Sequence, residues 1–156
     1  MAEIGALSES LEDYLEVIYH LVQEKKVARV RDIAGRKGVK MSSVVGALRR
    51  LAAADLIHYR AREYVELTED GEDLAKKVVA RHEFLTQFFV EILGVDEEAA
   101  EEEACSVEHV LDGATMIRMR RLSNFLREYP GMMDTLNELN PAGEITEDAP
   151  MPTPKG

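Results

Sequence analysis

Proline, cysteine and aromatic side chains are scarce in this sequence, and each shortage narrows what the chain can be. All five prolines lie at or beyond Pro130, so proline interrupts no helix in the first 129 residues. The single cysteine excludes an intramolecular disulfide and is typical of proteins in a reducing cytoplasm. Aromatic residues make up 6% of the chain and apolar residues 46%, a balance typical of helix-rich soluble proteins.

Long apolar runs are missing as well. No segment approaches the roughly 20 apolar residues that are needed to cross a bilayer. The sequence begins MAEIGALSES, which has neither a basic head nor a long apolar stretch, and so it shows no export signal. We therefore expect a cytoplasmic protein that has no membrane partner.

Charge is distributed unevenly along the chain. The net charge of −11 by itself argues against binding to nucleic acid. Residues 25–62, however, hold eleven lysines and arginines against two aspartates, a net charge of +9, while the remainder carries −20. Salt screens repulsion from the acidic part beyond about 8 Å, so the basic segment can act as its own module. This division indicates nucleic-acid binding.

The spacing of apolar residues predicts an ordered series of helices and two strands. The expected helices cover residues 10–23, 30–36, 41–54, 69–90 and 95–111, with a last one after Gly113, and the expected strands cover 56–59 and 64–67. Thr68 is expected to cap the fourth of these helices, because the acidic residues that follow it, Glu69, Asp70 and Glu72, suit the positive N-terminal end of a helix. The last helix is expected to bury a stripe of Met116, Met119, Leu122 and either Phe125 or Leu126. Three helices followed by a hairpin and a further helix is the order of a winged helix-turn-helix domain, here followed by a helical second domain.

The helix expected over residues 41–54 would lie in the major groove of DNA. Its apolar residues Val44, Leu48 and Leu51 fall on one face, which leaves a polar and basic face outward. The candidate DNA contacts on this face, its N-terminal flank and the hairpin tip are Lys40, Ser42, Ser43, Val45, Gly46, Arg49, Arg50, Arg60 and Arg62. The alternative is a merely solvated basic face. The coincidence of the charges with a groove-reading pattern favours DNA binding.

A second group of residues suggests a metal site. Cys105, Glu108 and His109 lie in the run ACSVEH at offsets of zero, three and four, which in a helix places them within an arc of about 100°. A thiol, a carboxylate and an imidazole on one face are suited to a divalent metal ion. Further candidate ligands on two other predicted helices are Asp13, Glu16 and His82. Mixed oxygen, nitrogen and sulfur donors favour Fe(II), Mn(II) or Co(II) over calcium or magnesium, and Zn(II) would bind as well.

Each of these residues also has a purely structural explanation. Cys105 is the kind of residue that is often buried as a small hydrophobe. Asp13 lies three residues after Ser10, the spacing of a helix capping box. Glu16 and Glu108 are explained equally well as solvated side chains. The combination of all six candidates is what favours a metal site.

Four runs occur in order along the chain: LEDYLEVIY, MSSVVGALRRL, ARHEFL and CSVEHVL. With them, residues 8–129 resemble the diphtheria-toxin-repressor and manganese-transport-regulator family of metal-dependent transcriptional repressors. The resemblance implies a winged helix-turn-helix domain with a two-stranded β wing, an all-helical dimerisation domain, and a homodimer that binds palindromic operator DNA when loaded with Fe(II) or Mn(II). We expect a DNA-binding domain over residues 1–70, a metal-binding and dimerisation domain over 71–129, and a C-terminal extension over 130–156, whose late prolines predict a flexible end.

The resemblance also assigns metal ligands by position. The manganese-type ligands are matched by Asp13, Glu16, His82, Glu108 and His109, and that branch has a glutamate in place of Cys105. The iron-type primary site is matched by Cys105, Glu108 and His109, and that branch has a methionine in place of Asp13. The thiolate favours Fe(II), with Mn(II) second. Thr86 and Glu101 replace a carboxylate and a histidine of the iron-type ancillary site, which makes Glu101 a possible extra ligand.

Two other functions remain open beside a repressor that controls metal-homeostasis genes. One is a winged-helix regulator that senses an organic ligand or the oxidation of Cys105, without metal. The other is a metalloenzyme that uses the same ligands. Hydrolysis would need an open coordination position and a positioned general base, and the sequence shows no separate group of residues of that kind. We therefore expect a regulator and not an enzyme.

Overall fold

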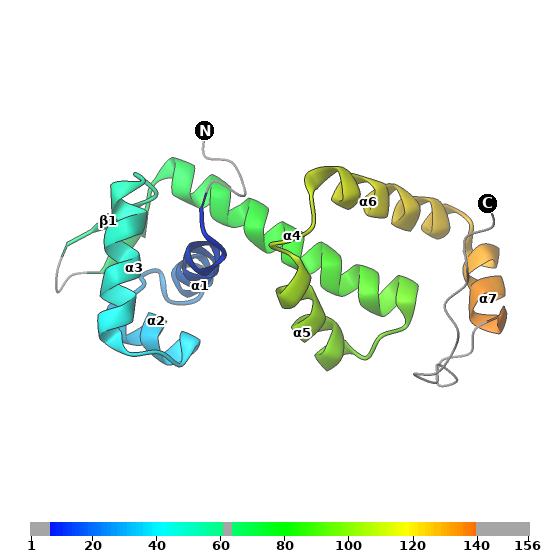
Figure 1. Ribbon diagram of the computed structural model, residues 1–156, viewed down its shortest axis with the longest axis horizontal. Coiled ribbons are helices and arrows are strands. Elements are labelled where there is room, and N and C mark those ends of the chain that lie inside the picture. Colours follow the sequence, from blue (N-terminus) through cyan, green and yellow to red (C-terminus); the bar gives the residue numbers. More distant parts are fainter. Residues whose placement is uncertain (1–6, 61–63, 140–156) are drawn as a thin grey trace. The chain divides into compact units, whose positions relative to one another are not determined.

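The computed structural model describes residues 7–60 and 64–139 (Figure 1). Its elements, in order, are α1 (Glu9–Lys25), α2 (Val30–Lys37), α3 (Met41–Ala53), β1 (Ile57–Tyr59), β2 (Val65–Leu67), α4 (Glu69–Leu93), α5 (Glu97–Val107), α6 (Gly113–Glu128) and α7 (Pro130–Leu139). This order confirms the mainly helical fold with a two-stranded wing. The chain forms two compact units, Met1–Leu85 and Thr86–Gly156, called the first and the second unit below, and the boundary between them lies within α4.

The first unit is built around a core that its helices and hairpin share. In it α1, α2 and α3 pack against one another, and β1 packs against α3. The expected inward face of α3 is confirmed, because Val44, Leu48 and Leu51 are completely buried. Full burial of such a side chain contributes about 1.5–3 kcal/mol to the free energy of folding. The three buried side chains therefore determine which side of α3 faces outward.

The wing is an antiparallel pair in which Ile57 faces Leu67, His58 faces Glu66 and Tyr59 faces Val65. The backbone NH of Val65 also donates to the carbonyl of Ala28 at 2.7 Å, which joins the hairpin to the loop before α2.

The start of α4 lies against the beginning of the wing. Thr68 caps this helix as expected, since its hydroxyl accepts from the backbone NH of Gly71 at 3.0 Å and donates to the carbonyl of Asp55 at 2.8 Å. A Cβ atom at Gly71 would collide with the carbonyl oxygen of Leu56, so only glycine allows this close approach.

The second unit contains the end of α4 together with α5, α6 and α7. Among its described residues, the buried apolar ones are Phe88 and Ile92 of α4, Ala100 and Ala104 of α5, and Leu126 of α6. Arg127 donates to Glu91 Oε2 at 2.6 Å and so links α6 to α4. The hydrogen bond from Arg127 lowers the pKa of Glu91, against an opposing effect of burial.

Two features of the C-terminal part were not predicted from the sequence. The stripe of α6 is only partly buried in the single chain: Leu126 is 8% exposed, but Leu122 is 48% and Phe125 is 45% exposed. No element was predicted directly after residue 129, where α7 begins at Pro130, a residue that suits the first turn of a helix. Residues 140–156, with the expected flexible end, lie outside the described residues.

None of the described helices combines the length and the apolar character that crossing a bilayer would require.

Candidate metal centre and DNA-binding surface

Candidate metal ligands of the first unit lie on α1 and α4. One face of α1 is buried through Leu11, Leu15 and Ile18, and Asp13 and Glu16 lie beside this face, half-buried. Since α1 begins at Glu9 with Ser8 as its N-cap, Asp13 is too far along the helix for the capping-box role. That structural explanation is therefore wrong.

Both candidate ligands of α1 have basic neighbours within the first unit. Lys37 Nζ donates to Asp13 Oδ2 at 3.0 Å, and His20 Nε2 lies 3.6 Å from Glu16 Oε1. His82 lies on α4 and is half-buried.

The ligand candidates of the second unit lie at the end of α5. The side chain of Glu108 is only 2% exposed and that of His109 is 10% exposed, and His109 Nε2 lies 3.2 Å from Glu108 Oε1. A carboxylate removed from water is costly unless a hydrogen bond, a positive charge or a metal ion compensates it. An imidazole and a buried carboxylate side by side are a donor pair that fits a divalent cation.

Cys105 is placed differently from these two residues. The expected arc assumed a helix through His109, but α5 ends at Val107 and residues 108–110 form a turn. Cys105 itself is exposed, so it is not the buried hydrophobe of the structural explanation. The structure thus brings Glu108 and His109 together and leaves Cys105 at the surface.

The proposed ancillary positions are adjacent. The hydroxyl of Thr86 donates to Glu101 Oε2 at 3.3 Å, which joins α4 to α5. Glu101 is exposed.

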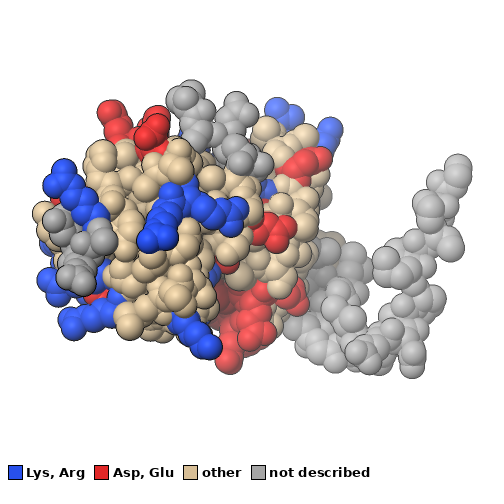
Figure 2. Space-filling view, turned by 60° about the vertical axis from the view of Figure 1, so that its left-hand side comes forward, with Lys and Arg blue, Asp and Glu red and all other residues tan. Residues whose placement is uncertain are grey.

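The expected DNA-reading residues are displayed by α3. Ser42, Ser43, Gly46, Arg49 and Arg50 are exposed along this helix, Val45 is half-buried, and the exposed Lys40 is the N-cap residue of α3. Lys and Arg side chains are numerous on the surface that the first unit presents in Figure 2. A row of serines and arginines on the outward face of a helix provides donors for phosphates and base edges.

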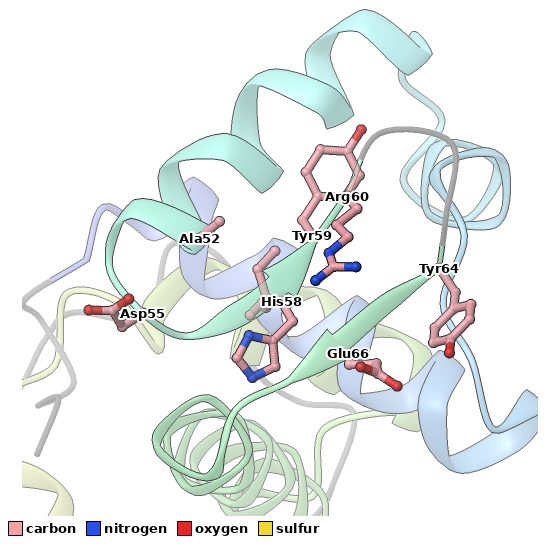
Figure 3. Close-up of a pocket in the computed structure, with 8 residues that line it drawn as sticks. Ala52, Asp55, His58, Tyr59, Arg60, Tyr64 and Glu66 are labelled. Atoms are coloured by element: carbon pink, nitrogen blue, oxygen red, sulfur yellow. The ribbon is translucent and has the colours of Figure 1, made fainter.

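The wing adds polar side chains beside Arg60 that were not predicted from the sequence. His58 and Glu66 face each other across the strands, and with Arg60 and Tyr64 they line a cavity of about 580 Å³ (Figure 3). Side chains along a strand point alternately to its two faces, so a strand over residues 56–60 places His58 and Arg60 on the same face of the hairpin. This pattern could have indicated these polar side chains from the sequence. Arg60 is exposed, whereas Arg62 lies outside the described residues.

Comparison with known families gives two matches that together span most of the chain. Residues 6–65 match the N-terminal DNA-binding domain of iron-dependent repressors. Residues 68–134 match the metal-binding and dimerisation domain of the same proteins.

Several curated relatives carry the name HTH-type transcriptional regulator MntR, among them those of Shouchella clausii and Bacillus subtilis. The protein of Shouchella clausii is 34% identical over 89% of this chain and 96% of its own length. That of Bacillus subtilis is 38% identical over 76% of this chain and 83% of its own length.

Solved structures show the same fold. A manganese-dependent transcriptional repressor in complex with manganese superimposes with a TM-score of 0.67 at 31% identity, covering 74% of this chain and 53% of that chain. IdeR of T. acidophilum gives a TM-score of 0.62 at 27% identity, covering 76% of this chain and 55% of that chain. The present chain therefore spans about half the length of these solved chains.

Proposed function

We propose a mechanism of metal control for this chain, which belongs to the iron-dependent repressor family. Membership confirms the predictions that the protein is a metal-dependent transcriptional repressor and that it is not an enzyme. Which ion it senses, which residues hold that ion and how the signal reaches DNA are the subject of the proposal.

The proposed ligands are Asp13, Glu16, His82, Glu108 and His109, with Cys105 as a candidate sixth ligand and Glu101 as a candidate at a second site. The observation that carries the proposal is the burial of Glu108 at 2% exposure beside His109. A buried carboxylate beside an imidazole offers an oxygen and a nitrogen donor, and a divalent ion bound there would add positive charge next to the carboxylate.

Mn(II) is our first choice of ion and Fe(II) the second. The thiolate was the argument for iron, and Cys105 is exposed. The remaining candidates are carboxylates and imidazoles, a set of oxygen and nitrogen donors that suits Mn(II). Zn(II) and Co(II) are expected to bind in vitro, because divalent affinity generally rises from manganese to cobalt and zinc.

We propose that ligand capture restrains the DNA-binding unit. Asp13 and Glu16 lie on α1, which packs against α2 and α3, so a restraint on α1 reaches the helix that reads DNA. A dimer reads two half-sites about 34 Å apart, or a multiple of it, and therefore needs a fixed spacing between its two reading helices.

Operator DNA and a second copy of the chain are the proposed partners. In this proposal, α3 enters the major groove with Ser42, Ser43, Val45 and Gly46 toward base edges and Arg49 and Arg50 toward bases or phosphates, while Lys40, Arg60 and Arg62 contact the DNA backbone.

Exposed apolar side chains on α6 support dimerisation, since Ile117, Leu122 and Phe125 are each 45–56% exposed in the single chain. We keep residues 1–70 as the DNA-binding domain and 71–129 as the metal-binding and dimerisation domain. Control of metal-homeostasis genes in the cytoplasm follows from this reading.

The test is DNA binding with and without metal. Random duplexes long enough for two half-sites are enriched on the protein in Mn(II), and the selected sequence is labelled for fluorescence anisotropy. The affinity should fall when a chelator replaces Mn(II), and His109→Ala should show the low affinity in both conditions. Equal affinity of the wild type with Mn(II) and with chelator would refute the proposal.

A further inference from the structure

Asp13, one of the proposed ligands, already has a cation beside it that comes from the protein itself. Lys37 Nζ lies 3.0 Å from Asp13 Oδ2, and the two side chains are 19% and 34% exposed. Lys37 is the last residue of α2, and Asp13 lies on α1. The pair therefore ties the first helix of the chain to the first helix of the helix-turn-helix.

A second contact holds Lys37 in this place. Its Nζ lies 5.0 Å from the centre of the Tyr14 ring, and Tyr14 is buried in the core at 6% exposure. An ammonium over an aromatic face is attracted by the ring quadrupole. By contrast, the lysine of the Lys76–Glu72 pair is 51% exposed and bridges one turn of α4. Lys37 is thus positioned by the fold, whereas Lys76 is an ordinary surface lysine.

We propose that Lys37 is an internal counter-cation that competes with the metal ion for Asp13 and so sets the metal concentration at which the repressor responds. The inference rests on the proposed function, since it requires Asp13 to be a ligand. An oxygen lone pair that accepts a hydrogen bond from Nζ is not available to a metal, and an ammonium repels a divalent cation. Metal binding is therefore an exchange at Asp13.

Lysine is suited to this role for a physical reason. Its charge is a compact point on a flexible four-carbon stem, so it can turn away into water at low cost. Arginine at the same position would present a planar fork to both carboxylate oxygens and would hold Asp13 at least as firmly.

The expected effect is measurable. Without the ammonium, Asp13 has no ion pair with Lys37 to give up, and the metal ion meets no repulsion from Lys37. We therefore expect Lys37→Gln to tighten Mn(II) binding about five- to tenfold. Lys37→Arg keeps the charge and should bind Mn(II) as the wild type does or more weakly. Lys76→Gln removes the same charge from the same unit, from a pair that holds no proposed ligand, and should leave the affinity unchanged.

The experiment titrates the full chain with Mn(II) alone and follows free Mn(II) by its paramagnetic resonance signal. Wild type, Lys37→Gln, Lys37→Arg, Lys76→Gln and Asp13→Asn are compared, and circular dichroism checks that each variant is folded. Tighter binding by Lys37→Gln alone supports the inference. If Asp13→Asn loses Mn(II) while Lys37→Gln binds like the wild type, the inference is wrong and the proposed function stands. If Asp13→Asn binds like the wild type, Asp13 is not a ligand, and both the inference and the proposed ligand set are wrong.

Discussion

Replacing His109 by alanine should destabilise the metal-free protein, because it takes the imidazole away from a carboxylate that has almost no access to water. Glu108 is 2% exposed and lies 3.2 Å from His109 Nε2. Removing a polar neighbour from a buried carboxylate leaves that carboxylate less well stabilised, at a cost of about 1.5–3 kcal/mol. We therefore expect the free energy of unfolding to fall by about 2 kcal/mol.

The stabilisation of the protein by Mn(II) gives a second test of the same pair. Mn(II) at a hundred times its Kd should raise the free energy of unfolding of the wild type by about 2.7 kcal/mol. His109→Ala should show none of this gain. The double variant with Glu108→Ala should lose less than the sum of the single losses, since it leaves no buried carboxylate behind.

The assay is urea unfolding followed by far-ultraviolet circular dichroism, with and without Mn(II), because the chain contains no tryptophan to report by fluorescence. Lys76→Gln serves as the surface control. The reasoning is refuted if the metal-free His109→Ala protein unfolds at the same urea concentration as this control, or if it keeps the stabilisation by Mn(II).

Three further outcomes are expected. Arg49→Ala, on the exposed face of α3, should weaken DNA binding and reduce the slope of log affinity against log salt by about 1 if the guanidinium contacts a phosphate, as titrations at several salt concentrations would show. Gly71→Ala should lower the free energy of unfolding by about 1–3 kcal/mol, measured by urea unfolding, since its Cβ would meet the carbonyl of Leu56. Arg127→Ala should lower the free energy of unfolding by at most about 0.5 kcal/mol near neutral pH, because the ion pair with Glu91 that it removes is exposed. The folded pKa of Glu91 is depressed, so this small contribution is present above pH 4.5 and is lost as the pH falls through the folded pKa, which unfolding curves at several pH values would detect.

Each of these outcomes has its own control. Lys76→Ala should leave the salt slope of DNA binding unchanged, and an equal effect of Arg49→Ala and Lys76→Ala would remove α3 from the proposed interface. Gly46→Ala is the counterpart of Gly71→Ala, because a Cβ at Gly46 meets nothing within 4 Å and alanine favours a helix by about 1 kcal/mol. A Gly71→Ala protein as stable as the wild type would contradict the close approach of Gly71 to the carbonyl of Leu56. If Arg127→Ala lost the same stability at pH 3 as at pH 7, the Glu91 pair would not be its cause.

Local sequence pattern predicted most of the fold. The apolar period placed the helices of the first unit close to their observed bounds, because each helix buries one continuous face in a shared core. Thr68 was recognised as a cap from its position before three acidic residues, and its hydrogen bond to Gly71 confirms this.

The features that the sequence pattern did not predict depend mostly on contacts between residues far apart in the sequence. The spacing of Leu122 and Phe125 indicates an apolar stripe but not what covers it, and within one chain they remain exposed. The run through Cys105 contains no glycine or proline to mark a helix end, so the end of α5 at Val107 was not foreseen. Lys37 and Asp13 are 24 positions apart, a contact that no local pattern reveals.

The most direct test of metal control is the Mn(II) affinity of the protein measured with and without saturating operator DNA. Coupling between two sites is reciprocal, so DNA must tighten Mn(II) binding by the same factor by which Mn(II) tightens DNA binding. The account predicts equal factors, well above one. An Mn(II) affinity that DNA leaves unchanged would contradict it.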